Sequence, residues 1–160
     1  EAYQRRVAAG GWPEEVYYSM YMVARLKEVM GHPIQDVTEA YSKAWEFRPE
    51  RLESVFHAMR KLREQSRWVL ALAYGESALQ RVGTRDILFV EPEIWQWRLL
   101  DEFSICAFYA GRVDSAAEKV TAIVNAPFFK DLPERERERI LKNSENFNRV
   151  LSSQKESFKK

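Results

Sequence analysis

Residues 49–79 read PERLESVFHAMRKLREQSRWVLALAYGESAL, and this stretch decides the fold. Its apolar residues follow a helical spacing on both sides of a polar turn at Arg63–Arg67, which predicts two helices packed as a hairpin. In the second helix, the small residues Ala71, Gly75 and Ala78 share one face. Because no bulky side chain on that face holds the backbones apart, a neighbouring helix can pack closely against it. The matching stripe of the first helix consists of Val55, Ala58, Met59 and Leu62.

The same small and apolar positions recur along the chain at a fixed offset. Ala44 and Ala78 lie 34 residues apart, as do Val37 and Ala71. Ala116 follows Ala71 by 45 residues, which is the 34-residue period plus about 11 inserted residues. We therefore predict an all-α fold, in which antiparallel helix hairpins stack as a superhelix and a C-terminal helix caps the stack.

We expect a single domain over residues 1–160. Its predicted parts are the tail of a preceding repeat (1–11), three helical hairpins (12–48, 49–80 and 92–126), an insertion (81–91) and a terminal helix (133–151). The insertion is predicted as an extended loop, with a short strand as the alternative. Its apolar run Ile87–Val90 is expected to pack against the hairpins, because four exposed apolar residues would be a liability.

The terminal helix has two predicted faces. Its packing face is expected to carry Ile140, Phe147, Leu151 and Phe158. Charges of alternating sign at Glu134–Arg139 predict a solvated surface at its start.

Composition excludes several classes of protein. Hydrophobic residues make up 46% of the chain and aromatic residues 13%, which excludes a disordered tail. The net charge of +1 supplies no overall field that would select nucleic acid or an anionic membrane. The sequence has no apolar run long enough to span a membrane and no secretory signal. Because residue 1 is Glu rather than Met, we expect a fragment or a processed chain.

No grouping of reactive side chains points to chemistry. His32 and His57 lie in different hairpins without other ligands at metal-binding spacing, and they are expected in a turn and on a helix flank. Cys106 lies in an apolar helix without a nearby base, so we expect a buried side chain rather than a nucleophile. As the single cysteine it forms no internal disulfide, which suits a reducing compartment, and we expect a cytoplasmic protein. We predict no catalytic residue, metal or cofactor.

The 34-residue helix–turn–helix period resembles the tetratricopeptide repeat (TPR), with the best match at Ser54–Leu79. A narrower resemblance covers most of the chain. The segments Tyr3–Tyr21, Ala44–Glu53, Asp86–Ser104 and Ala107–Arg112 resemble the TPR-containing region that follows a family-2-type catalytic domain in large bacterial and viral glycosyltransferases. The catalytic domains of that family carry a D-x-D nucleotide–metal site, and no D-x-D occurs in these 160 residues. The resemblance therefore implies an accessory region and not the transferase itself.

The TPR resemblance also implies where a partner binds, because the first helix of each hairpin lines the concave side of such a stack. By register, this groove should contain Tyr18, Tyr21 and Arg25 from the first hairpin, Phe56, Arg60 and Arg63 from the second, and Arg98, Asp101 and Ile105 from the third. Aromatic rings interleaved with exposed arginines can bind an extended acidic or aromatic peptide. The alternative is a solvated groove whose arginines pair with Glu28, Glu53 and Glu64.

The leading functional hypothesis is a non-catalytic protein-interaction or scaffold module, associated with a glycosyltransferase. Its expected partner is a protein or peptide segment, and another domain of the same polypeptide is one candidate. An RNA-binding helical repeat is the second hypothesis, which the near-zero net charge and the acidic residues beside the arginines oppose. A stand-alone enzyme is the third, and no group of residues supports it.

Overall fold

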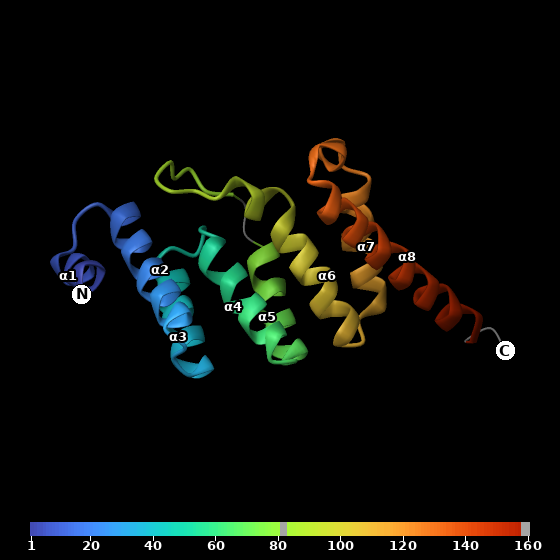
Figure 1. Ribbon diagram of the computed structural model, residues 1–160, viewed down its shortest axis with the longest axis horizontal. Helices are drawn as coiled ribbons and strands as arrows, with labels where there is room; N and C mark the ends of the chain where they lie inside the picture. Colours follow the sequence, from blue (N-terminus) through green and yellow to red (C-terminus); the bar gives the residue numbers. More distant parts are fainter. Residues whose placement is uncertain (81–82, 158–160) are drawn as a thin grey trace.

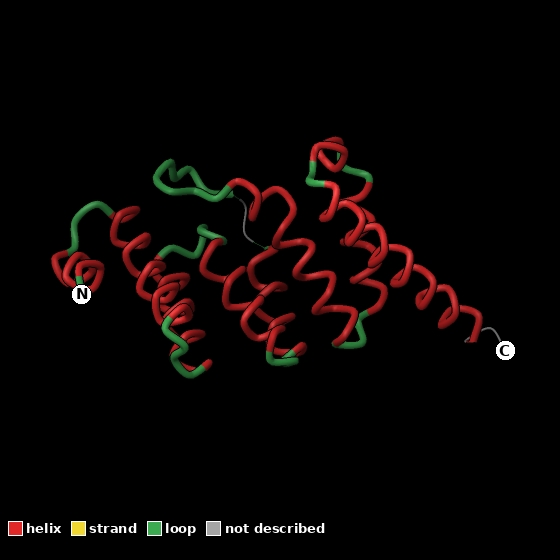
Figure 2. The backbone as a smooth tube through the Cα atoms, in the orientation of Figure 1, coloured by secondary structure: helices red, strands yellow, loops and turns green. Residues whose placement is uncertain are grey.

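The computed structural model describes residues 1–80 and 83–157, which form an elongated row of helices with the two termini at opposite ends (Figure 1). No strand occurs in this described part, and Figure 2 accordingly shows only helices and loops. The prediction of an all-α fold is confirmed. The α-helices are α1 (Ala2–Ala9), α2 (Pro13–Val29), α3 (Ile34–Phe47), α4 (Glu53–Glu64), α5 (Trp68–Leu79), α6 (Leu99–Tyr109), α7 (Val113–Val124) and α8 (Glu134–Ser157).

The ends of these helices follow local sequence signals. Pro13 opens α2 at its first position, where the missing N–H is not needed, and two glutamates follow in the first turn. Gly31 and Gly111 lie two residues beyond the last residues of α2 and α6, with φ of 72° and 82°. Side chains are disfavoured in this left-handed conformation, so glycine permits the tight turns into α3 and α7.

The helices pack in sequence order, as a chain of hairpins requires. The pairs α2–α3, α4–α5 and α6–α7 are each in contact, and α3 also packs on α4 and α5 on α6. Ala71 and Ala78 are fully buried, and a Cβ atom added to Gly75 would lie 2.7 Å from both Met59 and Phe103. The small-residue face of α5 therefore allows α4 and α6 to approach at the position that the sequence predicts.

The core consists of two clusters along the row. The smaller cluster joins α2, α3 and α4 and contains Tyr17, Tyr21, Ala24, Val37, Tyr41, Ala44 and Ala58. The larger cluster extends from Leu52 in front of α4 to Ile140 and Phe147 on α8. Since α8 covers the far side of α7, it closes that end of the core as a capping helix should.

Two terminal segments differ from the expected pattern. In Figure 1, α1 is seen end on beside α2, whereas α2 to α7 lie roughly along one direction. The interpretation of residues 1–11 as the tail of a preceding repeat stays a prediction. Helix α8 continues to Ser157 instead of ending at residue 151. Phe158, expected on its packing face, lies outside the described residues.

The insertion after α5 is a loop over its described residues 83–91, and the expected packing of its apolar run is wrong for Ile87, which is 83% exposed. Phe89 is 55% exposed, but its ring stacks on Tyr18 of α2. The loop is held instead by hydrogen bonds between its backbone and side chains of the hairpins. Arg51 donates to the carbonyl oxygens of Leu88 and Phe89 at 3.1 and 3.2 Å. The carboxylate of Glu14 accepts the N–H groups of residues 87 and 88.

Candidate functional site

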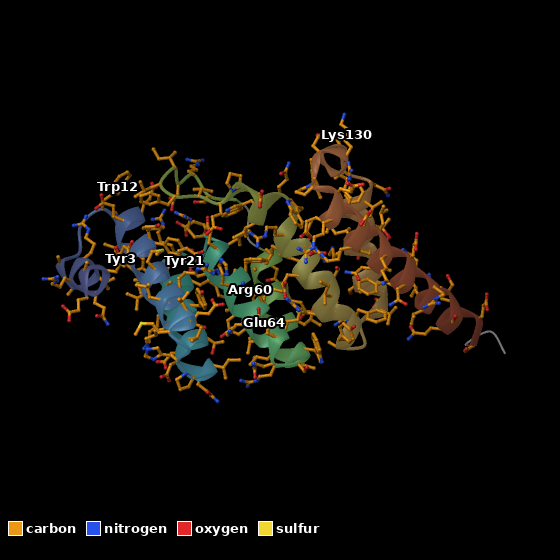
Figure 3. The ribbon with its side chains drawn as sticks, in the orientation of Figure 1. Tyr3, Trp12, Tyr21, Arg60, Glu64 and Lys130 are labelled. Carbon is orange, nitrogen blue, oxygen red and sulfur yellow. The ribbon has the colours of Figure 1, made fainter. Side chains whose placement is uncertain are left out.

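An open groove of about 560 Å³ lies between α4, the beginning of the third hairpin and the start of α8. The residues predicted for the second and third hairpins all line it, and these are Phe56, Arg60, Arg63, Arg98, Asp101 and Ile105. Figure 3 labels Arg60 on α4, between α2 and α6. The repeat register therefore placed the contributions of these two hairpins on one surface.

Arg98 reaches this groove from a π-helical turn, η1 (Ile94–Arg98), which continues directly into α6. A π turn accommodates one residue more than a regular turn, and it shifts the direction of the side chains around it. Here Trp97 is 6% exposed and belongs to the larger core cluster, whereas the side chain of Arg98 remains 34% exposed. Both residues line the groove, but Trp97 is anchored in the core whereas Arg98 extends toward the solvent.

The floor of the groove contains two carboxylates held by arginines. Arg63 donates to Glu102, and Arg139 of α8 donates to both oxygens of Asp101 at 2.6 and 3.2 Å. The two carboxylate side chains are 8% exposed, whereas Arg63 is 29% and Arg139 is 38% exposed. Burial raises the pKa of both carboxyl groups, and the neighbouring arginines offset this only in part. The arginines therefore favour the charged form of these acids, against the effect of burial, and lie nearer the solvent.

Arg60 pairs with the α2 carboxylate of Glu28, and Glu64 on its own helix lies 3.9 Å away. Two of the pairings considered in the alternative interpretation are thus present, although the third acid, Glu53, pairs with Arg51. Arg60 and Arg63 are thus partly exposed arginines, 26% and 29%, that are already engaged in internal ion pairs. Each holds a carboxylate that is at most 12% exposed. Removal of Arg63 would leave Glu102 without its ion-pair partner, whereas Glu28 would keep Arg25 and Lys61 at 3.8 and 3.9 Å.

Arg98 is the groove arginine with the weakest internal contacts. Its guanidinium carbon lies 4.9 Å from the centre of the Phe56 ring, an arrangement that allows a cation–π contact. The nearest carboxylate oxygen belongs to Glu93, at 3.9 Å, and that side chain is 69% exposed. Among the described residues no hydrogen bond holds Arg98. Its N–H groups are therefore available to a ligand.

The three candidates from the first hairpin do not line this groove. Tyr18 stacks on Phe89 of the insertion with the ring centres 4.1 Å apart. Tyr21 is buried and donates a hydrogen bond of 2.7 Å to Glu91. Arg25 lies 3.0 Å from the Nδ1 atom of a histidine of α4. Two of these side chains therefore connect α2 to the insertion, and their role in binding stays a prediction.

That histidine is His57, which is only 4% exposed instead of lying on a helix flank. Its ring stacks on Tyr41 at 5.7 Å and packs against Phe56 at 5.0 Å. Burial above all, and then the positive charges of Arg25, Arg60 and Arg98, lower the pKa of His57 to about 2. The imidazole is therefore neutral over the physiological range and experiences a positive potential.

This environment predicts a pH dependence of stability. The unfolded chain protonates His57 below its ordinary pKa of 6.5, whereas the folded chain does not until about pH 2. The contribution of the neutral, buried His57 to the free energy of unfolding is therefore fully present above pH 6.5 and is lost as the pH falls. The loss between pH 7.5 and 5 should be about 2 kcal/mol. Urea unfolding of the parent and of His57→Gln should diverge by this amount, and parallel pH curves for the two proteins would contradict the assignment.

No group of three or more histidine, cysteine, aspartate or glutamate side chains in residues 1–80 and 83–157 is arranged to hold a metal ion. None of the described helices has both the length and the apolar character that crossing a bilayer requires. Comparison with protein-family models, with curated proteins and with solved structures finds no match for this chain. Function is therefore argued from the geometry of the groove.

Proposed function

We propose that this chain is a non-catalytic protein-interaction module that binds an extended acidic or aromatic segment of a partner in the groove between α4, α6 and α8. The observation that carries the proposal is that the arginine side chains in the groove are more exposed than the acids on its floor. Four arginine side chains that are 26–38% exposed lie in one groove, while the acids on its floor, Asp101 and Glu102, are 8% exposed. Glu93 and Glu136 also line the groove beside Arg98 and Arg139, and their side chains are 69% and 34% exposed, so an acidic segment would meet guanidinium groups together with these two acids.

The chemistry of arginine supports a peptide ligand. A guanidinium has five N–H donors in a plane, and the internal ion pairs in the groove use only some of them. The remaining donors can bind a carboxylate in a bidentate manner, and Phe56 provides an aromatic surface beside Arg98. Packed neighbouring helices lie about 10 Å apart, a distance that about three residues of extended chain can span.

We further propose that the hairpins form a TPR-like superhelix and that the region accompanies a glycosyltransferase domain in the cytoplasm. The 34-residue offset, the all-α fold and the buried small-residue face of α5 support the first part. The sequence segments that resemble the glycosyltransferase-associated region support the second. The partner segment then belongs to another protein or to another domain of the same polypeptide.

Arg98→Glu tests the groove, because Arg98 holds no buried acid. We expect this variant to lose the proteins that the parent retains in a pull-down from the native source. Its free energy of unfolding should fall by about 1 kcal/mol or less, as expected for loss of one partly exposed cation–π contact. Arg112→Glu is the matched control, since the Arg112 side chain is 54% exposed and, among the described residues, forms an ion pair only with the exposed Glu76, at 3.5 Å.

Identical sets of bound proteins for the parent and Arg98→Glu would remove the groove as the interaction site. The same pull-down should be repeated after nuclease treatment and at increasing salt. An RNA-binding repeat would be favoured instead by a combined result. The parent would retain RNA, this retention would fall steeply as the salt concentration rises, and no protein partner would remain after nuclease treatment.

A further inference from the structure

Two buried N–H donors on α4 lack an acceptor. Among the described side chains, the buried atoms without a hydrogen-bond partner include Nε2 of His57 and Nε of Arg60. Arg25 can only donate, so the Nδ1 atom of His57 that faces it at 3.0 Å must accept. The proton of the neutral imidazole is therefore on Nε2, which makes this atom an unsatisfied donor. Buried donors are nearly always paired, so an acceptor is missing here.

These donors lie in a positively charged part of the molecule. His57 and Arg60 are three residues apart on α4, which places them on the same side of the helix. Arg98 and the His57 ring both contact Phe56, with centre distances of 4.9 and 5.0 Å. The positive charges of Arg25, Arg60 and Arg98 all act on the imidazole. Glu28, the nearest carboxylate of α2, already accepts from Arg60 and from the hydroxyl of Tyr41.

We propose that an oxyanion, the carboxylate or phosphate group of a bound segment, accepts hydrogen bonds from His57, Arg60 and Arg98 beside Phe56. Arg60 and Arg98 line the groove there, and His57 is buried against the same phenylalanine. The proposal rests on the proposed function, because it assigns the anchoring point of the partner. An anionic oxygen would satisfy both orphaned donors and would pair with the one groove arginine that holds no buried acid.

Access to this position is consistent with the exposure of its surroundings. The side chain of His57 is buried, but Arg60 is 26% and Arg98 is 34% exposed. The side chain of Arg98 has no hydrogen bond to another described residue, so its rotation toward an anion breaks only the contact with Phe56 and the 3.9 Å approach to the exposed Glu93. Exposed side chains change rotamer within nanoseconds, and such a rotation therefore poses no kinetic obstacle.

The test uses the intact chain with ¹⁵N-labelled histidine and two probes, inorganic phosphate and acetate, at constant ionic strength. We expect saturable shifts of the Nε2 signal of His57, while the exposed His32 serves as an internal reference. A response to phosphate alone identifies the phosphate source, and a response to acetate identifies the carboxylate source. Arg98→Gln should weaken the binding of the responding probe by about tenfold, the effect of losing one charge-assisted contact. Arg112→Gln should leave it unchanged.

A His57 signal that responds to neither probe, or that responds equally in Arg98→Gln, would overturn the anion site and leave a water molecule as the acceptor. This result is distinguishable from failure of the proposed function. If the pull-down depends on Arg98 while His57 is silent, the groove binds a partner without this anchor. If His57 responds while the pull-down is unchanged, the anion site stands and the groove is not the partner site.

Discussion

Leucine at position 75 should lower the free energy of unfolding by about 3 kcal/mol, the upper part of the range for overpacked cores. A Cβ atom at Gly75 would lie 2.7 Å from Cε of Met59 and 2.7 Å from Cδ2 of Phe103. The methionine end is flexible and can move, but the ring of Phe103 is 4% exposed within the core. The larger side chain must therefore separate α5 from α4, α6 or both.

Two variants of the same helix make this result specific. Gly75→Ala adds only the Cβ atom, so its cost should be smaller than that of Gly75→Leu. Ala73→Leu is the matched control, because Ala73 lies on the exposed side of α5. Urea unfolding followed by circular dichroism should show the order Ala73→Leu, Gly75→Ala and Gly75→Leu, from least to most destabilised. If Gly75→Leu unfolds at the same urea concentration as the parent, the packing assigned to this face is incorrect.

The position of Gly75 could be predicted because helix packing depends on local periodicity. Ala71, Gly75 and Ala78 are spaced so that they must share a face. A face without large side chains has few uses other than close packing. The same reasoning identified Val37 and Ala44, which are both fully buried. Predictions of this kind require only that each segment be helical, and they hold wherever the helix is regular.

The groove could be predicted only in part, because its shape depends on contacts between distant segments. Arg139 was assigned to a solvated face on the basis of neighbouring charges, yet it binds Asp101, 38 residues earlier in the chain. Nothing in the local pattern of α8 indicates this partner. The register did predict that Phe56 and Arg98 lie on one surface, and both line the groove. It failed to show that the insertion lies over Tyr18 and Tyr21 and engages both.

The π turn and His57 show a second limit of prediction from the sequence. A helical repeat is read from sequence with a constant 3.6-residue period, and an additional residue in one turn is invisible to that analysis. Histidine is intermediate in its preference for burial, so the residue type alone does not decide between a flank and the core for His57. Its burial among Tyr21, Tyr41 and Phe56 follows from the meeting of α2, α3 and α4.

Replacing Arg51 with methionine should lower the free energy of unfolding by about 3–5 kcal/mol, because the change leaves a buried acid without its counter-ion. Arg51 and Glu53 are both fully buried, and their side chains form two hydrogen bonds of 3.0 and 3.2 Å. The guanidinium also lies 4.5 Å from the centre of the Tyr17 ring and 3.3 Å from a carboxylate oxygen of Asp86. Methionine preserves much of the packing but none of these polar contacts.

The double variant Arg51→Met/Glu53→Gln separates lost charge from lost packing. Glutamine keeps an oxygen that can accept the N–H of Glu91, now at 3.1 Å from Glu53, and removes the unpaired charge. The double variant should therefore be more stable than Arg51→Met alone, with a coupling energy of about 2 kcal/mol. Additive effects of the two changes would mean that the ion pair contributes little and that packing around Arg51 dominates.

Hydrogen exchange should show where this loss of stability is located. Arg51 binds the carbonyl oxygens of Leu88 and Phe89, so its removal releases the insertion from the hairpins at the point where the backbone is held. The amides of Ile87, Leu88 and Glu91, which are bound by side-chain carboxylates in the parent, should exchange faster in Arg51→Met than the amides of α7. Equal acceleration throughout the chain would instead indicate that the insertion unfolds only together with the helices, and that Arg51 stabilises the whole row rather than this loop.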